Sequence, residues 1–288
     1  MSRKKAMDRL KLGLGTLRPV RLHEAENWGL SEGDLEGTLV EHRGPALLFG
    51  SFPASKVLGD LQARGILDTL RTRGYRNFEF RSESESAFES RIRLYGSHPS
   101  VEEPCVLMDV RTHRGELSGA SPCLGRPLHV RSLIWEWLSF QDPLAPFPPG
   151  VQALPGQEHP GLGIFRPSVQ LMLDYVAEMD IDALVGLPQY FHNAVLYGTR
   201  FRFFLPALEG DFRALRRDLL AEGLPRASRA LAEGRVLEVG SGRRVTWQPA
   251  EQVYPVQGEI CDHFKHPAWL QEVEQALRAS RYRIVDEA

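Results

Sequence analysis

The stretch LPGQEHPGLGIFRP (residues 154–167) opens the part of the chain that decides the fold. Its two glycines, Gly161 and Gly163, come directly before a helical pattern, and Pro167 suits the first turn of a helix. Over residues 166–180, apolar side chains recur at spacings of three and four and form one helical face. We therefore expect a tight glycine turn that leads into a helix.

Short apolar or alternating segments on both sides of this helix predict strands. Two long ones precede the glycine turn and two shorter ones follow it, separated by a short helix over 189–199. Within the first long segment, the tripeptide HRG is expected to form a tight turn. The strand segments are EPCVLMDVRTHRGELS (103–118), LHVRSLIWEWLSFQD (128–142), ALVGLP (183–188) and RFRFFLP (200–206). This order predicts an α/β protein with a mixed sheet.

The region before these segments predicts a strand–helix–strand beginning. PALLFGS (45–51) is typical of a short buried strand, and RNFEFRS (76–82) alternates like a second one. Between them, residues 55–74 show helical spacing of their apolar side chains, and a glycine ends the pattern.

The last eighty residues have a different character. Charged helical segments and a closing helix over 266–281 flank a predicted hairpin over 235–249. We expect three parts: a flexible basic tail over 1–20, an α/β core with its N-terminal extension over 21–206, and a helical and β-hairpin appendage over 207–288.

The composition is that of an ordinary globular protein. The 288 residues are 42% hydrophobic and 25% charged, with a formal net charge of −2 and a pI of about 6.5, which gives no basic footprint for nucleic acid. No apolar stretch is long enough to predict a membrane span. The three cysteines, Cys105, Cys123 and Cys261, are too few for a disulfide scaffold and favour a reducing, cytoplasmic location.

The glycine turn also has the features of a phosphate site. A helix N-terminus carries free N–H groups and a partial positive charge, and glycines allow a phosphate to approach the backbone closely. Gly161-Leu162-Gly163-Ile164 would therefore hold a phosphate-bearing cofactor, or form only a plain turn. The Rossmann fingerprint is not met, because its third glycine and its ribose-binding acid are missing.

A second segment, HNAVLY (192–197), follows about one strand later. Together with the glycine turn it resembles the GNAT superfamily of N-acyltransferases, over roughly residues 104–206. Gly161 and Gly163 match the two small positions of that family's cofactor turn. On the later helix, Asn193 and Tyr197 match the family signature. The sequence departs from the pattern at Glu158, which stands at the usual Gln or Arg position, at Pro160, and at Arg200 or Arg202, one of which replaces a glycine.

The resemblance implies a GNAT-like core that binds acyl-CoA and moves its acyl group to a small-molecule or peptide amine. It places the pyrophosphate on the backbone N–H groups of Leu162, Gly163 and Ile164, and the cofactor arm or a water on Asn193. Tyr197 would then be the general acid for the departing thiolate. The acceptor amine needs a base, for which the candidates are Glu136 first, then Asp109 and His192.

Two other interpretations stay open: a GNAT-like binding or regulatory module without catalysis, and an unrelated α/β protein. The two extensions of the core would shape the acceptor site or a homo-oligomer contact. No metal site is expected, because CDHFKHP (261–267) has no second half with zinc-ligand spacing. VLEVGSG (236–242) resembles a methyltransferase motif, but too little chain follows it for that fold.

Overall fold

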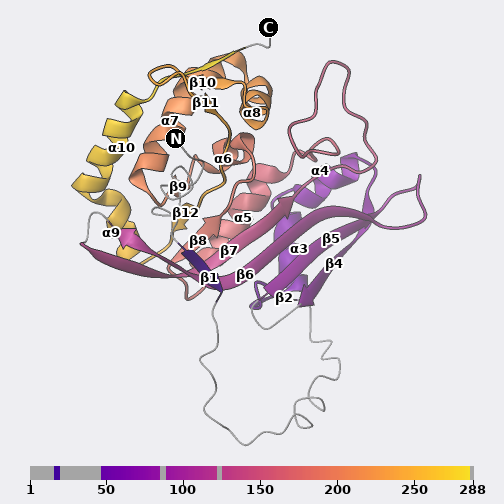
Figure 1. Cartoon of the computed structure of the whole chain (residues 1–288). Coiled ribbons are helices and arrows are strands. Elements are labelled where there is room, and N and C mark those ends of the chain that lie inside the picture. Colours follow the sequence, from indigo (N-terminus) through magenta and orange to yellow (C-terminus); the bar gives the residue numbers. More distant parts are fainter. Residues whose placement is uncertain (1–15, 20–46, 85–88, 122–124, 286–288) are drawn as a thin grey trace, which may run out of the picture.

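The computed structural model describes residues 16–19, 47–84, 89–121 and 125–285. These residues form a mixed α/β structure built on one large sheet, as the sequence predicts (Figure 1). Two small sheets stand apart from it, one near each end of the described chain. Their strands are β2 (Leu47–Leu48), β3 (Phe52–Pro53), β10 (Val236–Glu238), β11 (Arg244–Val245) and β13 (Tyr282–Ile284).

The large sheet has the strand order β4-β5-β6-β7-β8-β12-β9, and β1 pairs with β6 off this path. Neighbouring strands are antiparallel, except that β7 and β8 run parallel. A parallel pair needs a crossover, and the glycine turn and its helix provide it. The strands are β1 (Thr16–Pro19), β4 (Arg76–Ser84), β5 (Glu89–Ser97), β6 (Cys105–Ser121), β7 (Arg126–Ser139), β8 (Ala183–Gly186), β9 (Arg202–Phe203) and β12 (Gln252–Pro255).

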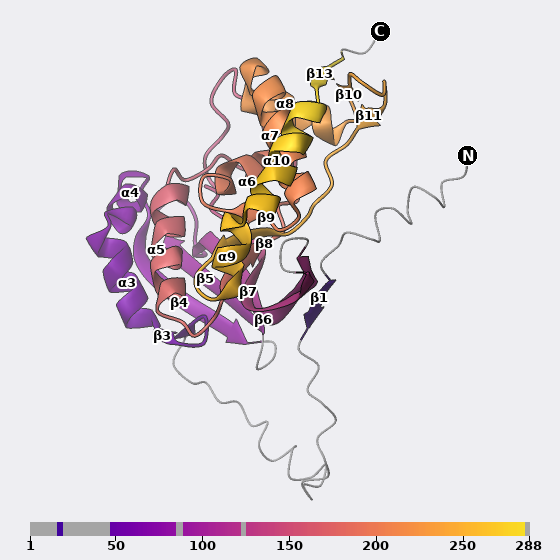
Figure 2. The same ribbon diagram turned by 90° about the vertical axis from the view of Figure 1, so that its left-hand side faces the viewer.

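Three helices cover one face of this sheet: α3 (Ala54–Ala63), α4 (Ile66–Thr72) and α5 (Phe165–Ala177) (Figure 2). Their apolar faces and the inward side chains of the strands form the largest core cluster. On β5, Ile92 and Leu94 are fully buried in this cluster, which explains the alternating pattern of that strand.

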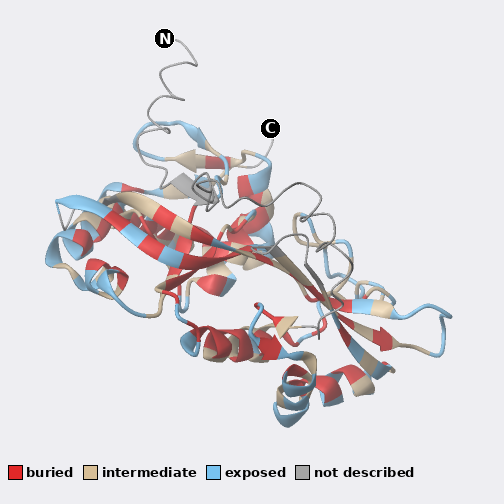
Figure 3. Cartoon of the chain, turned by 90° about the horizontal axis from the view of Figure 1, so that it is seen from below, coloured by how far each residue is buried: buried red, intermediate tan, exposed pale blue. Residues whose placement is uncertain are grey.

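Among the residues that the structure describes, the opposite face of the sheet is covered at one end. A second apolar layer lies over β7, β8 and β12, and a third cluster joins the helices of the C-terminal part (Figures 1 and 3). The third cluster contains residues of α6 (Phe191–Tyr197), α7 (Pro206–Leu219) and α8 (Leu224–Ala232), and the C-terminal part continues with α9 (Glu259–Lys265) and α10 (Pro267–Ala279). The other end of this face carries the polar side chains of β5 and β6.

Two local predictions are wrong. The tripeptide HRG does not turn, because β6 runs through it to Ser121 and pairs with β7 along this length. The predicted helix over 55–74 is two helices, because Gly65 adopts the left-handed region at φ 70° and ends the first of them. A left-handed residue reverses the direction of the chain and is favoured at glycine.

The C-terminal segment is more closely joined to the core than the sequence indicates. Its strand β12 lies between β8 and β9 in the large sheet, and it pairs with both of them. The predicted hairpin is present as β10 and β11, and β13 adds to it. Of the predicted basic tail over 1–20, residues 16–19 form β1, and the rest lies outside the described residues.

Two glycines inside helices give a matched test of this packing. Gly210 lies where α7 meets α10, and a Cβ there would come 2.5 Å from the Val273 carbonyl oxygen. Gly210→Ala is expected to lower the free energy of unfolding by about 1–3 kcal/mol, because the two helices must move apart. Gly59 in α3 faces open space, so Gly59→Ala is expected to raise it by about 0.5–1 kcal/mol. Urea denaturation measures the change in the free energy of unfolding for each variant. If both variants raise it or both lower it, the α7–α10 packing is contradicted.

Candidate functional site

The glycine turn is fastened to the chain that follows β7. Gln141 and Gly161 form an antiparallel bridge, the Leu162 N–H donates to the Phe140 carbonyl at 3.1 Å, and the Asp142 N–H donates to the Pro160 carbonyl at 2.8 Å. The Gln141 side chain adds to this by accepting from the N–H groups of the two residues before Pro160. The turn therefore has a fixed position at the end of β7.

Two of the three backbone N–H groups predicted to bind phosphate have no acceptor among the described residues. The Leu162 N–H is engaged, whereas no hydrogen bond within the described residues takes up the N–H of Gly163 or Ile164. Gly163 adopts φ 78°, and α5 begins two residues later without a side-chain cap. The sequence thus places the positive end of a 13-residue helix dipole at this turn.

A buried carboxylate anchors an arginine beside the turn. Asp142 accepts from the Tyr75 hydroxyl at 2.6 Å and pairs with Arg73 at 3.1 Å, and its side chain is 6% exposed. Burial opposes ionisation of Asp142, but the hydrogen bonds from Tyr75 and Arg73 outweigh it and hold its pKa below the usual value. The other end of the Arg73 guanidinium lies 3.7 Å from the position of a Cβ on Gly163.

The parallel strands β7 and β8 part close to this turn. Their pairing ends at Trp135 and Gly186, where β8 stops, while β7 continues to Ser139. A β-bulge at Glu136 lies at the same point, because the pairing with β6 shifts between Trp135 and Trp137. Within the described residues, no strand pairs with the last four residues of β7 on the β8 side.

The structure brings Tyr197 to this point. Its ring lies 6.2 Å from Trp135 and stacks at 6.1 Å on Phe165, the first residue of α5. A Cβ on Gly186 would be 3.7 Å from the Tyr197 ring. Burial raises the pKa of Tyr197, and a hydrogen bond from Asn193 only partly offsets this effect. The two sequence segments that carried the resemblance therefore meet at the end of β8.

Three buried polar atoms of residues near Tyr197 have no hydrogen-bond partner in the part of the chain that the structure describes. They are Trp135 Nε1, Asn193 Oδ1 and Gln252 Oε1. Gln252 pairs with Gly186 across the strands, and its amide nitrogen donates to the Ala194 carbonyl at 3.3 Å. Buried polar atoms are nearly always paired, so this donor and these two acceptors are available to a bound molecule or to waters.

Trp135 and Gln252 are site residues that the sequence analysis missed. No motif marks either of them. The position of Gln252 depends on the insertion of β12 beside β8, which is a contact between segments far apart in the chain. The alternation in β7 predicts that Trp135 is a large inward side chain, but it says nothing about a partner for the indole N–H.

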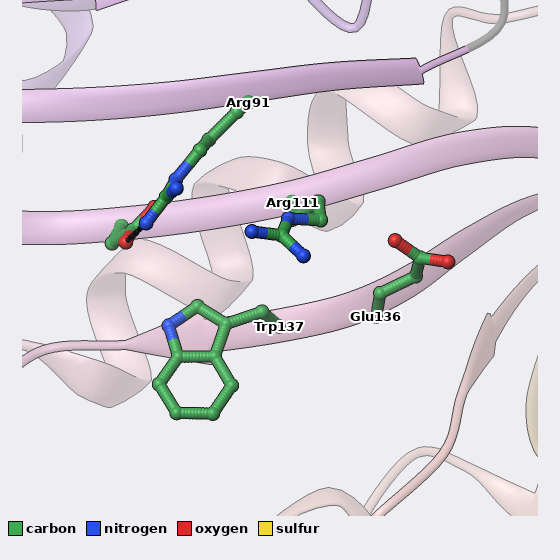
Figure 4. A pocket seen from close by; sticks show the side chains of 5 residues that line it. Arg91, Arg111, Glu136 and Trp137 are labelled. Atoms are coloured by element: carbon green, nitrogen blue, oxygen red, sulfur yellow. Dashed lines mark hydrogen bonds and ion pairs between the residues drawn. The ribbon is translucent and has the colours of Figure 1, made fainter. Parts of the chain in front are cut away.

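The predicted base, Glu136, lies on the other face of the sheet. It lines a cavity of about 330 Å³ together with Arg91, Asp109, Arg111 and Trp137 (Figure 4). Its carboxylate lies 3.1 Å from His113 Nδ1 and its side chain is 40% exposed. Neighbouring residues of a strand point to opposite faces, so Glu136 and Tyr197 lie on the two sides of β7.

The two alternative bases, Asp109 and His192, already interact with other side chains. Asp109 accepts two hydrogen bonds from Arg91, at 3.0 and 2.6 Å. His192 is buried against α8, where its Nδ1 lies 2.8 Å from Ser228 Oγ, and burial lowers the pKa of His192 to about 4. Of the three candidate bases, Glu136 therefore has the side chain most exposed to solvent.

Other chemistry suggested by composition finds no site in the described part of the chain. No group of three or more metal-ligating side chains comes together there, and His263 of CDHFKHP is buried against Ser121 and the Phe204 carbonyl. None of the helices in the described ranges combines the length and the apolar character that crossing a membrane requires. No family model matches the chain, and neither does any curated protein or solved structure.

Proposed function

We propose that this protein is an acyl-CoA-dependent N-acyltransferase with a GNAT-like arrangement. The observation that supports the proposal is the meeting of three features where β7 and β8 part: the glycine turn at the start of α5, the buried Tyr197–Asn193 pair, and the open edge of β7. These are the parts that a cofactor with a diphosphate, an amide-bearing arm and a thioester would contact in sequence.

The residues present suit the diphosphate end of acyl-CoA, but with two backbone N–H donors in place of the three that the sequence predicts. The open N–H groups of Gly163 and Ile164 would hold it, and Arg73 would add a positive charge beside them. The Leu162 N–H would take no part, because Phe140 already accepts from it.

The arm would lie along the open edge of β7. No strand in the described ranges pairs with the backbone from Glu136 to Ser139 on that side, so its polar groups suit an extended chain with amide groups. Trp135 Nε1 and Asn193 Oδ1, a buried donor and a buried acceptor without partners, would find theirs in this arm.

The cofactor supplies an activated acyl thioester. The acceptor nitrogen would attack its carbonyl carbon as the carbon–sulfur bond breaks. Tyr197, whose raised pKa keeps the phenol protonated, would donate its proton to the departing thiolate. Glu136, on the opposite side of β7 and 3.1 Å from His113 Nδ1, would take the proton that the acceptor amine loses.

A second candidate, a GNAT-like binding module without catalysis, has one observation in its favour. The engaged Leu162 N–H leaves the turn with fewer donors for a diphosphate than the resemblance implies. Such a module would bind acyl-CoA or its acceptor but would release no thiol in the presence of amines. Thiol release therefore distinguishes the two candidates.

Acetyl-CoA is expected to raise the melting temperature of the full chain, with a shift of several degrees once its concentration exceeds Kd about 100-fold. Two variants of the turn give a matched pair: Gly163→Asp and Gly163→Asn have nearly the same shape and both tolerate a positive φ. The added carboxylate is expected to weaken acetyl-CoA binding at least about tenfold relative to the amide. No thermal shift at millimolar acetyl-CoA would overturn the proposal.

A further inference from the structure

The cavity lined by Glu136 contains the proposed base, but its other residues have no role yet in the proposed function. It is formed by β5, β6 and β7 on the side opposite α3, α4 and α5 (Figure 4). Its volume of about 330 Å³ is at the lower end of the range for small-molecule sites. It is therefore large enough for a molecule of the size of an amino acid.

One guanidinium in this cavity, that of Arg111, has no carboxylate partner among the described residues. Asp109 binds Arg91 through two hydrogen bonds and lies 3.8 Å from Arg93, so this carboxylate is shared by two arginines. Arg111 forms no ion pair or side-chain hydrogen bond with any residue that the structure describes, and its Nε is buried without a partner. A half-buried guanidinium without compensation favours an anionic ligand, above all a carboxylate that it can bind through two hydrogen bonds.

The same cavity also contains a negative charge, the carboxylate of Glu136. The Glu136 carboxylate also lines the cavity, and Figure 4 shows it on the far side of Arg111 from Arg91. No ion pair joins Glu136 to Arg111 among the described residues, and its near neighbour is His113. The cavity thus offers a cation and an anion that do not neutralise each other, an arrangement that suits a ligand with both charges.

An exposed indole forms the remaining wall. Trp137 lies opposite Arg111 in the strand register and is 49% exposed, which is unusual for so large an apolar side chain. It would cover an apolar or aromatic group of a ligand whose carboxylate is held by Arg111.

We propose that the acceptor is an α-amino acid with an apolar side chain, an inference that rests on the proposed function for its chemistry. Arg111 binds the carboxylate, Glu136 binds the ammonium and takes its proton, and Trp137 contacts the side chain. Glu136 passes this first proton to solvent, and the freed amine forms the new carbon–nitrogen bond as the carbon–sulfur bond of the thioester breaks. Glu136 then takes the second proton that the nitrogen loses, and Tyr197 protonates the thiolate. The products are an N-acylated amino acid and the free thiol.

Binding to the full chain without acyl-CoA tests the pocket directly. Three probes of similar shape distinguish the contributions of the two charged groups. They are L-phenylalanine, phenethylamine, which lacks the carboxylate, and 3-phenylpropanoate, which lacks the amine. Calorimetry is expected to show L-phenylalanine binding at least about tenfold more tightly than either analogue. Equal binding of phenethylamine would overturn the role of the carboxylate, and no binding of L-phenylalanine or L-leucine at millimolar concentration would overturn the proposal.

Variants of β6 test the residue that carries the inference. Arg111→Gln is expected to remove the preference for L-phenylalanine over phenethylamine, and Arg111→Lys is expected to restore part of it. Arg114→Gln, an exposed position on the same strand, serves as the control and should leave the preference unchanged. An unchanged preference in Arg111→Gln would overturn the assignment.

Acetyl-CoA binding, measured on the same samples, separates this inference from the proposed function. Amino-acid binding without acetyl-CoA binding would overturn the acyltransferase and retain the pocket as an amino-acid site. Acetyl-CoA binding and thiol release with amines that lack a carboxylate, but not with amino acids, would overturn the inference and retain the acyltransferase.

Discussion

Tyr197→Phe is expected to lower kcat for acyl transfer by about 100-fold or more, while Kd for acetyl-CoA changes less than about twofold. The substitution removes only the hydroxyl that would protonate the thiolate. The ring keeps its contacts with Trp135 and Phe165, so the walls of the site stay in place. Thiol release with a saturating amine gives the rate, and calorimetry gives Kd.

Tyr282→Phe provides the control for this experiment. Burial raises the pKa of Tyr282 to about 12, as burial raises that of Tyr197, but Tyr282 lies in the small sheet of β13. Its variant is expected to transfer acyl groups at the wild-type rate. A wild-type rate in Tyr197→Phe would remove Tyr197 from the mechanism, and a parallel loss of acetyl-CoA binding would show that it positions the cofactor instead.

The crossover at the centre of the fold was predictable from the sequence because its signals are local. A helix that buries one face repeats its apolar side chains every three or four residues, and α5 does so from the residue after the glycine turn. A strand with one buried face alternates, as β5 and β6 do. The glycines mark the turn for the same reason, since Gly163 has a positive φ.

The rest of the candidate site depends on pairing between distant segments, which leaves no local signal. The Tyr197 ring packs beside Trp135, which is a contact between distant segments, and Glu136 as the next residue of β7 therefore points to the other face of the sheet, although both Glu136 and Tyr197 were predicted for one site. Gln252 reaches the site only because β12 inserts beside β8. The unpaired guanidinium of Arg111 depends on Asp109 being taken by Arg91 across the strands.

The carboxylate of Asp142 supports both the fold and the proposed cofactor turn. It is buried, and it holds Tyr75 and Arg73 from the first part of the chain against the segment that follows β7. Its own N–H donates to Pro160, so the same residue fixes the glycine turn. Asp142→Ala leaves a buried hydroxyl and a guanidinium without their acceptor. Because Arg73 is partly exposed, the main cost is the buried Tyr75 hydroxyl left without an acceptor, and the substitution is expected to lower the free energy of unfolding by about 1–3 kcal/mol, measured by urea denaturation at pH 7.

The pH dependence of this effect has a definite sign. The folded-state pKa of Asp142 lies below the unfolded value of about 3.9. Its contribution is therefore complete above that value and is lost as the pH falls through the folded pKa. The difference between wild type and Asp142→Asn should shrink as urea denaturation is repeated from pH 6 down to pH 3. Asp68→Asn removes an exposed ion pair with Arg71, and its cost at pH 6 is expected to be much smaller than that of Asp142→Asn, because solvent screens exposed pairs. Equal costs for the two variants would contradict the buried anchor, and with it the reason that Arg73 lies beside Gly163.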